Sequence, residues 1–309
     1  MYSDKNRVSL NRKMVIVCLV IILIAIVAAN LWRLNPQDRD AMRAVSIYTE
    51  ILKETRIIGE NYTEELTTTL GYYPAKMVSE DPIAAALMVR LLKEAGVTKN
   101  SVIAINASGS FPGFTLAALA ACAALDLETY IIASIGSSTY GANIPGNTIA
   151  DMLLQENVRS LGHTLLAITP GGGRDMGLNL DENELRRIAE MVQREGIPYI
   201  VPDGTLDAIA IRESMFIDKG STLLMNVGGN HASTGGNLEL NLMAGIIWPD
   251  EVNSFDDPGL IQSFLNRKIP VIQVLNVRLL YSSYGLEFDQ EGRILGNSQL
   301  LLSPTSTSR

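Results

Sequence analysis

Residues 14–32 read MVIVCLVIILIAIVAANLW and carry no charged side chain. At about 1.5 Å per residue, a helix of this length nearly spans the roughly 30 Å hydrocarbon core of a bilayer. The preceding residues carry four bases, Lys5, Arg7, Arg12 and Lys13, against one acid, Asp4. The positive-inside rule therefore predicts a single-pass cell-membrane protein with residues 1–13 in the cytoplasm and the main domain outside the cell.

A cleaved signal peptide is the alternative interpretation of this segment. It also has a basic start and an apolar run. The run is long for a signal peptide, however, and residues 28–30 (AAN) are the best match to a cleavage site. A buried soluble helix is disfavoured because the run has no polar face. We therefore expect an uncleaved helix over 14–32, a linker over 33–40, an α/β domain over 41–302 and a flexible tail over 303–309.

The charge balance limits the partners of the main domain. The chain has a formal charge of −8, and its first 32 residues contribute +3, which leaves −11 for residues 33–309. An acidic domain repels polyanions at long range, so nucleic acid is not an expected partner. An acidic ligand would have to be held locally, by backbone N–H groups or a few arginines. Cys18 lies in the apolar run and Cys122 in an Ala-rich segment, so no disulfide framework is expected.

Short apolar segments alternate with helical patterns along most of the chain. This alternation predicts an α/β fold with a mainly parallel sheet flanked by helices. The predicted strands cover 101–106, 129–134, 165–168, 198–201, 221–227 and 270–274. The predicted helices cover 41–58, 81–95, 115–125, 148–156, 181–195, 205–216, 238–244, 258–265 and 276–284. Binding sites in such sheets form outside the carboxyl ends of the strands.

The loop over 106–114, NASGSFPGF, joins a predicted strand to a predicted helix. Its backbone N–H groups could converge on a carboxylate or phosphate at the start of the helix. Asn106 and Gly109 are candidate binding residues, and Ser108 or Ser110 is a candidate nucleophile. The loop lacks the lysine of a Walker A motif and matches neither GxGxxG nor GxSxG. A tight turn with a capping serine is the alternative.

Two further loops are rich in small polar residues. The segment 134–146 and the helix after it supply Ser137, Asn143 and Asp151 as candidate binding residues. The turn 171–177 supplies Gly172, which permits close backbone approach, and Arg174, which could clamp a carboxylate through two hydrogen bonds. Solvated surface loops are the alternative for both.

The glycine-rich loop over 226–236, NVGGNHASTGG, contains the strongest candidate for proton transfer. His231 stands at the end of a predicted strand, where a histidine is accessible as an acid or base. Asn230 and Ser233 could orient it or bind substrate, although His231 could instead only satisfy turn backbone. We interpret His163 as a structural residue. The sequence has no HExxH or CxxC motif, so it indicates no metal and no cofactor. We expect the loops at 106–114 and 226–236 to meet at one edge of the sheet, because both follow short apolar strands.

Five segments together resemble the family of poly-γ-glutamate system proteins. They are the apolar run, INASGSFPGF (105–114), SSTYGANIPGNTIADM (137–152), TPGGGRDMGLNL (169–180) and NVGGNHASTGG (226–236). The resemblance implies a membrane protein that works in making, exporting or trimming the anionic capsule polymer poly-γ-glutamate. It implies a process and names no reaction.

Three functions are consistent with the sequence. The domain could be an accessory factor that binds glutamyl oligomers or the membrane synthase components. It could be a hydrolase or transferase of γ-glutamyl amide bonds, with Ser108 or Ser110 as nucleophile, His231 as base and backbone N–H groups as oxyanion hole. It could also be a sensor of a small acidic ligand.

Overall fold

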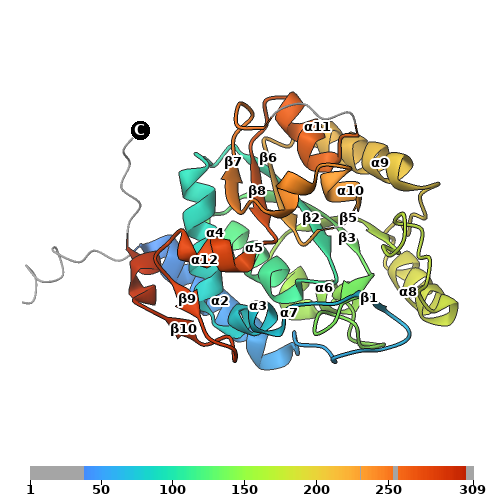
Figure 1. The fold of residues 1–309 in the computed structure, drawn as a ribbon, viewed down its shortest axis with the longest axis horizontal. Helices are drawn as coiled ribbons and strands as arrows, with labels where there is room; N and C mark the ends of the chain where they lie inside the picture. The colour runs from blue at the N-terminus through green and yellow to red at the C-terminus, as the bar shows by residue number, and fades with distance from the viewer. Residues whose placement is uncertain (1–37, 230, 253–256, 304–309) are drawn as a thin grey trace, which may run out of the picture.

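A six-stranded sheet forms the centre of the molecule. The structure is a computed structural model that describes residues 38–229, 231–252 and 257–303. The strands lie in the order β5-β3-β2-β6-β8-β7, all parallel except β7, which pairs antiparallel with β8 at one edge. They are β2 (Val102–Ser108), β3 (Glu128–Ser134), β5 (Thr164–Thr169), β6 (Leu223–Val227), β7 (Gly245–Ile247) and β8 (Val271–Val274). The predicted α/β fold with a mainly parallel sheet is confirmed (Figure 1).

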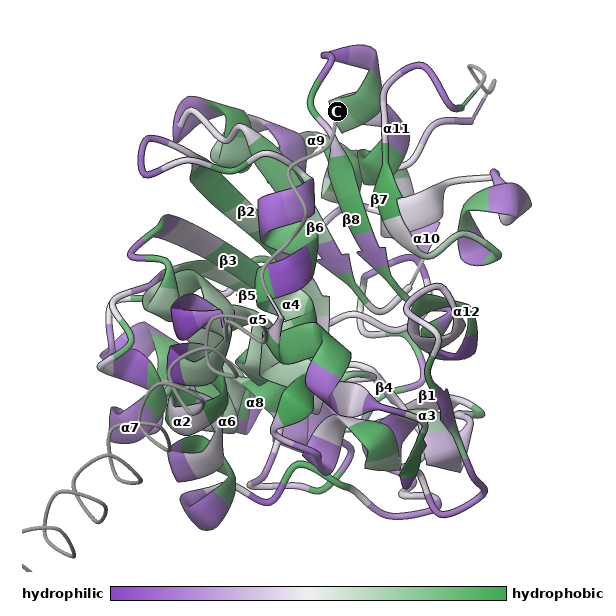
Figure 2. Ribbon diagram, turned by 90° about the vertical axis from the view of Figure 1, so that its left-hand side faces the viewer, coloured by the Kyte–Doolittle hydropathy of each residue, from purple (hydrophilic) through white to green (hydrophobic). Residues whose placement is uncertain are grey.

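Helices cover both faces of this sheet. On one face, α5 (Pro112–Ala124) contacts β2 and β3 as well as α2 (Arg39–Glu54) and α4 (Ile83–Glu94). Almost every side chain of α5 is buried, which explains why this Ala- and Leu-rich segment has no polar face. The other face packs against α9 (Thr205–Asp218) and α11 (Leu260–Asn266). Strands buried on both sides are typical of parallel sheets, and β2, β6 and β8 are largely hydrophobic in Figure 2.

Shorter elements surround these two layers. A parallel pair, β1 (Thr67–Thr69) with β4 (Ser137–Ser138), lies beyond the carboxyl end of β3, and an antiparallel pair joins β9 (Glu287–Phe288) to β10 (Ile294–Leu295). The other helices of the described residues are α3 (Tyr73–Met77), α6 (Ile149–Leu153), α7 (Glu156–Arg159), α8 (Glu182–Arg194), α10 (His231–Thr234) and α12 (Val277–Ser282). Three 3-10 turns cover η1 (Val78–Glu80), η2 (Leu238–Asn241) and η3 (Ser298–Leu302).

The order of the strands creates a topological switch point between β2 and β6. From β2 the chain runs outward through β3 to β5, then returns to the opposite side of β2 to form β6. The loops that follow β2 and β6 therefore leave in opposite directions, and a crevice opens between them at the carboxyl edge of the sheet. The parallel pairing of β2 with β6 confirms that the loops at 106–114 and 226–236 lie at the same edge.

Several predicted boundaries were wrong. The segment 198–201 is not a strand: Tyr199 makes one isolated bridge to Ile168, and Pro198 has no N–H with which to extend the pairing. The helix predicted over 41–58 begins earlier, capped by Asp38, and ends at Glu54, where Thr55 turns extended. The helix after β2 begins at Pro112 rather than 115, with proline in the first turn. The helix predicted over 238–244 is the short 3-10 turn η2.

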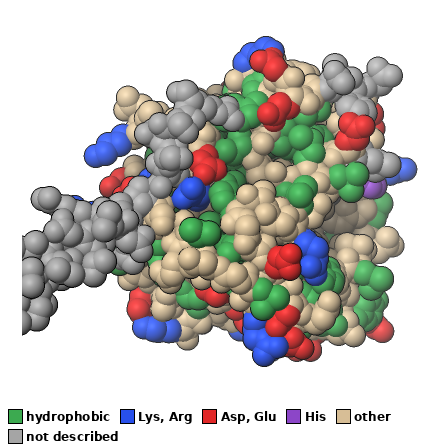
Figure 3. Space-filling model, turned by 60° about the vertical axis from the view of Figure 1, so that its left-hand side comes forward, with side chains coloured by type: hydrophobic (Ala, Val, Ile, Leu, Met, Phe, Trp, Pro, Cys, Tyr) green, Lys and Arg blue, Asp and Glu red, His purple; other side chains and the backbone are tan. Residues whose placement is uncertain are grey.

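The predicted membrane anchor lies outside the described residues. Within the described part of the chain, we find no helix that is both long and apolar enough to cross a bilayer. Residues 304–309 of the predicted tail also lie outside the description. On the face drawn in Figure 3, basic side chains are scattered and mostly stand beside acidic ones, with no broad basic patch there.

Candidate functional site

A row of polar side chains crosses the carboxyl half of the sheet on the face covered by α9. At Asn106, Asn226 and Gln273, strands β2, β6 and β8 are in register. The Asn226 side chain donates to the Gln273 Oε1 at 2.6 Å, and Asn106 donates to the Asn226 Oδ1 at 2.7 Å and to the Ser233 Oγ at 3.0 Å. Buried polar groups cost free energy unless they are paired, so this row fixes the relative position of the strand ends and α10.

Arg212 of α9 is the centre of this polar network. It is fully buried, and it forms an ion pair with Asp175 whose Nη2–Oδ2 distance is 2.7 Å. Its guanidinium also donates to Ser134 Oγ at 2.9 Å, to Thr169 Oγ1 at 2.8 Å and to Asn106 Oδ1 at 3.2 Å. Burial raises the pKa of Asp175, and Arg212 opposes that shift. One helix thus holds the ends of β2, β3 and β5 and the turn at 171–177 together.

The two loops at the switch point pack closely against each other. A Cβ atom placed on Gly228, whose φ is +92°, would lie 2.2 Å from the Ser108 Oγ and 3.6 Å from the Phe111 ring. Only glycine fits there, because the position requires both a left-handed conformation and the absence of a side chain. The loops after β2 and β6 therefore form one continuous surface, as the sequence predicts.

A cavity of about 560 Å³ opens beside this surface. Its lining includes Thr205 and Leu206 from the first turn of α9, His231 and Thr234 from α10, and Asp257. The residue before α9 is Gly204, so no side chain caps the N–H groups of the first turn. The positive end of α9 and an exposed imidazole thus border the same space, an arrangement that favours a bound carboxylate.

A buried lysine lies on the other side of the 108–111 loop. Lys76 of α3 is 3% exposed, and its ammonium donates to the Ser138 Oγ at 2.9 Å and to the Ser110 carbonyl. The same nitrogen stands 3.5 Å from the centroid of the Phe111 ring. Burial lowers the pKa of Lys76 to about 7.

The candidate serines of the sequence do not pair with His231. Ser108 Oγ accepts a long hydrogen bond of 3.4 Å from the Ser110 N–H, and Ser110 Oγ accepts from the Ser138 N–H at 3.0 Å. Among the described residues, no hydrogen bond joins either serine to His231. The hydrolase interpretation with these three residues therefore gains no support from the geometry, although His231 does line the cavity.

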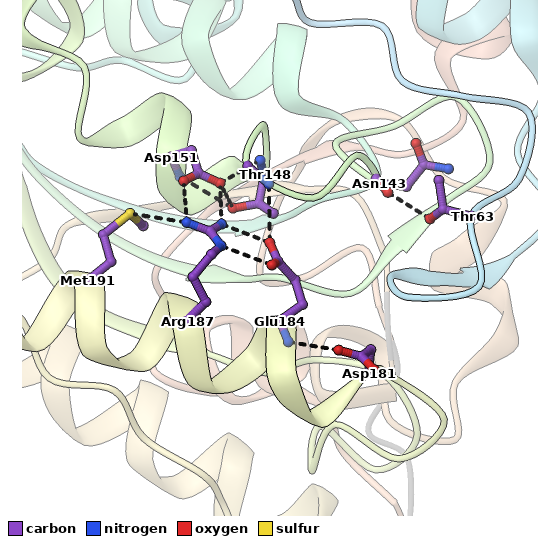
Figure 4. Close-up of polar contacts among 9 residues, drawn as sticks. Thr63, Asn143, Thr148, Asp151, Asp181, Glu184, Arg187 and Met191 are labelled. Atoms are coloured by element: carbon purple, nitrogen blue, oxygen red, sulfur yellow. Dashed lines mark hydrogen bonds and ion pairs between the residues drawn. The ribbon is translucent and has the colours of Figure 1, made fainter.

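Several predicted binding residues hold loops together instead of lining the cavity. Ser137 Oγ donates to the carbonyl of Gly109 at 2.9 Å, and Asn143 bonds to the backbone of Glu60 in both directions. Asp151 closes a capping box with Thr148, and Arg187 lies between Asp151 and Glu184 (Figure 4).

The remaining candidates divide between buried, exposed and undescribed positions. Ser233 is buried, and its Oγ accepts a hydrogen bond from Asn106. Gly172 adopts φ +69° within the 171–177 turn, and the Arg174 side chain beside it is exposed to solvent. Asn230 lies outside the described residues.

Two charged residues in this region, Arg212 and Lys76, were not predicted from the sequence. Arg212 stands four residues after Ala208 and four before Phe216, both buried on the same face of α9. An arginine within the apolar face of a helix indicates a buried polar network, because a buried arginine needs a partner, and the sequence contained this signal. Lys76 left no comparable signal, because its short helix has no clear periodicity and its burial depends on loops distant in sequence.

No family model and no curated protein matches the chain. Among solved structures, a hydrogen sulfide-producing enzyme from Fusobacterium nucleatum is 16% identical, over 60% of this chain and 57% of its own, with a TM-score of 0.22. An L-serine ammonia-lyase from Rhizomucor miehei is 12% identical, over 71% of this chain and 75% of its own, at 0.19. O-ureido-L-serine synthase is 13% identical, over 78% and 82%, at 0.21. The chain spans just over half the length of the first of these enzymes, and scores this low carry no argument about its fold or function.

Proposed function

We propose that this chain is a membrane-anchored accessory component of poly-γ-glutamate synthesis or export, and that it binds glutamyl carboxylates in the cavity between α9 and α10. The observation that carries the proposal is the meeting of the uncapped first turn of α9 with His231 around one cavity. The resemblance of five segments to the poly-γ-glutamate system family suggests that the ligand is poly-γ-glutamate. The charge-free run at 14–32 suggests the membrane anchor.

The chemistry of a γ-glutamyl unit matches the groups around the cavity. Its free carboxylate would accept hydrogen bonds from the N–H groups of the first turn of α9, from the Thr205 hydroxyl and from His231. Its amide N–H would donate to the Asp257 carboxylate. Because the domain as a whole is acidic, such contacts can hold one or two glutamyl units, whereas a long polyanion would be repelled elsewhere on the surface.

Removing a donor from the cavity should weaken binding. A hydrogen bond to a charged group contributes about 1.5–3 kcal/mol, so we expect His231→Ala to lower the affinity for a short γ-glutamate oligomer by about tenfold or more. Calorimetry on the full-length chain in detergent measures this change. The other histidine of the chain, His163, does not line this cavity, so His163→Ala is the matched control and should bind normally.

A second variant tests the helix terminus itself. Thr205 is the first residue of α9, a position where proline is compatible with the helix but removes one N–H donor. Thr205→Pro should therefore weaken binding with little change in melting temperature, and Thr205→Val separates the contribution of the hydroxyl. Loss of binding in Arg174→Ala, with His231→Ala and Thr205→Pro unchanged, would move the ligand to the 171–177 turn and refute the cavity.

The membrane topology has its own test. Reporter fusions on either side of residues 14–32, or protease treatment of intact cells, should find the main domain outside the cell and the intact segment in the mature chain. A domain protected from protease would contradict the proposed orientation. A mature N-terminus near Asn30 would convert the anchor into a signal peptide.

A further inference from the structure

Lys76 and Ser138 form a buried pair of an amine and a hydroxyl, separated by 2.9 Å. Both residues are at least nine-tenths buried, with exposed fractions of 3% and 4%. Ser138 belongs to β4, and its N–H donates to the Ser110 Oγ at 3.0 Å. The Lys76 nitrogen also contacts the Ser110 carbonyl and the ring of Phe111. Both members of the pair are therefore held in place by the loop after β2.

Burial of the Lys76 side chain favours an uncharged amine. Lys76 forms no ion pair among the described residues, and burial alone accounts for the lowering of its pKa to about 7. Most lysines are fully protonated at neutral pH, whereas the lowered pKa of Lys76 favours loss of its proton near that pH. A neutral amine within hydrogen-bond reach of a hydroxyl is the arrangement that activates a serine for nucleophilic attack.

The backbone at Gly71 closes over the pair on one side. A Cβ atom placed on Gly71 would lie 2.9 Å from the Ser138 Oγ and 3.1 Å from the Lys76 Cε. The segment that contains Gly71 carries the exposed side chains Leu70 and Tyr72, and its Gly71 N–H bonds to the Thr139 hydroxyl at 2.7 Å. A glycine in a surface segment thus covers the pair without a side chain, and a shift of this segment would expose the hydroxyl to a substrate.

We propose that Ser138 is the nucleophile and Lys76 the general base of an acyl-transfer site. The substrate class, a γ-glutamyl amide, rests on the proposed function. This site differs from the candidate with Ser108, Ser110 and His231, and it uses a hydroxyl and an amine that already contact each other.

The reaction needs only the amide substrate and an acyl acceptor, which is water or an amine. Lys76 Nζ takes the proton of the Ser138 hydroxyl while Oγ bonds to the amide carbonyl carbon. The C–N bond then breaks, and the leaving amine takes the proton from Lys76, which leaves an ester on Ser138. Water or the amine of another chain gives a proton to Lys76 and attacks the ester. Lys76 then gives that proton to the Ser138 Oγ as the C–O bond breaks and the new acid or amide departs, which restores the free amine and the hydroxyl.

A fluorophosphonate probe, which carries no glutamate, tests this pair directly. On the full-length chain it should modify Ser138, with a bond formed from Oγ to phosphorus and loss of fluoride, as located by peptide mass spectrometry. The rate should rise with pH and reach half its maximum near pH 7, where Lys76 loses its proton. Lys76→Met should slow labelling by about 100-fold or more, the scale of a general base, and Ser138→Ala should abolish it.

Two controls separate reactivity from folding. Ser221 is another buried serine, which lies before β6 at the opposite end of the sheet. In the Ser221→Ala variant, the probe should therefore label Ser138 at the wild-type rate. Lys76→Met keeps the apolar stem but removes the donor to the Ser110 carbonyl, so a melting temperature well above the assay temperature must show that the variant is folded when it is labelled. Absence of an adduct on Ser138, an adduct on Ser108 or Ser110 instead, or undiminished labelling of Lys76→Met would overturn the inference. Oligomer binding by calorimetry is independent of this result, so the two proposals fail separately.

Discussion

Replacing Asp175 with alanine should destabilise the protein by about 3–5 kcal/mol, the cost of leaving one member of a buried ion pair without its partner. Asp175 is 3% exposed, and Arg212 is fully buried. Without the carboxylate, the guanidinium keeps neutral partners among the described residues, namely the hydroxyls of Ser134 and Thr169, the amide of Asn106 and the carbonyl of Ala208. Chemical denaturation of the detergent-solubilised chain, followed by circular dichroism, measures the loss.

A double variant separates the charge from the packing. Asp175→Ala combined with Arg212→Met removes both charges, so it should recover a large part of the stability that the single variant loses. The control is Asp250→Ala, which breaks the exposed ion pair with Lys268 and should cost about 1 kcal/mol or less. If the double variant is as unstable as Asp175→Ala alone, unpaired charge is not the cause.

Gly235→Ala should have the second large effect, because it acts on the wall of the cavity. Gly235 has φ +59°, and a Cβ atom there would lie 2.3 Å from the Asp257 carbonyl oxygen and 2.4 Å from the Gly259 nitrogen. Both neighbours are backbone atoms that cannot rotate away. Overpacking costs about 1–3 kcal/mol and the left-handed conformation about 1–2 kcal/mol, so melting temperature and oligomer binding should both fall.

Gly146→Ala is the matched control for this variant. Gly146 also has a positive φ, of +77°, but a Cβ atom there meets no atom within 4 Å. It should cost only the conformational part, about 1–2 kcal/mol, and leave binding unchanged. Equal losses in the two variants would show that the close contact between residues 235 and 257–259 is not present in solution.

The sequence predicted the sheet well because strand and helix patterns are local. The alternation of apolar strands and helices identified β2, β3, β5, β6 and β8 to within a few residues. The prediction of a strand over 198–201 was wrong because Pro198 has no N–H to donate to a neighbouring strand. The apolar pattern of the segment does not reflect the loss of this one hydrogen bond. The edge strand β7 was missed because three residues are too few to show a period of two.

The site was predictable only as far as it depends on topology. The meeting of the loops after β2 and β6 followed from their position after parallel strands, and the pairing of those strands confirms it. The roles of individual side chains did not follow. Asp175 rather than its neighbour Arg174 enters the network, because the backbone turns one side chain inward and the other outward. Such choices depend on contacts between segments far apart in the chain.

The most direct test of the proposed carboxylate site is a crystal structure of the chain with a γ-glutamyl oligomer bound. We predict ligand density in the cavity between α9 and α10, with a glutamyl carboxylate within hydrogen-bond distance of the first-turn N–H groups of α9 or of the His231 imidazole. Ligand density confined to the 171–177 turn, or an empty cavity at a ligand concentration that saturates binding in solution, would contradict the proposal.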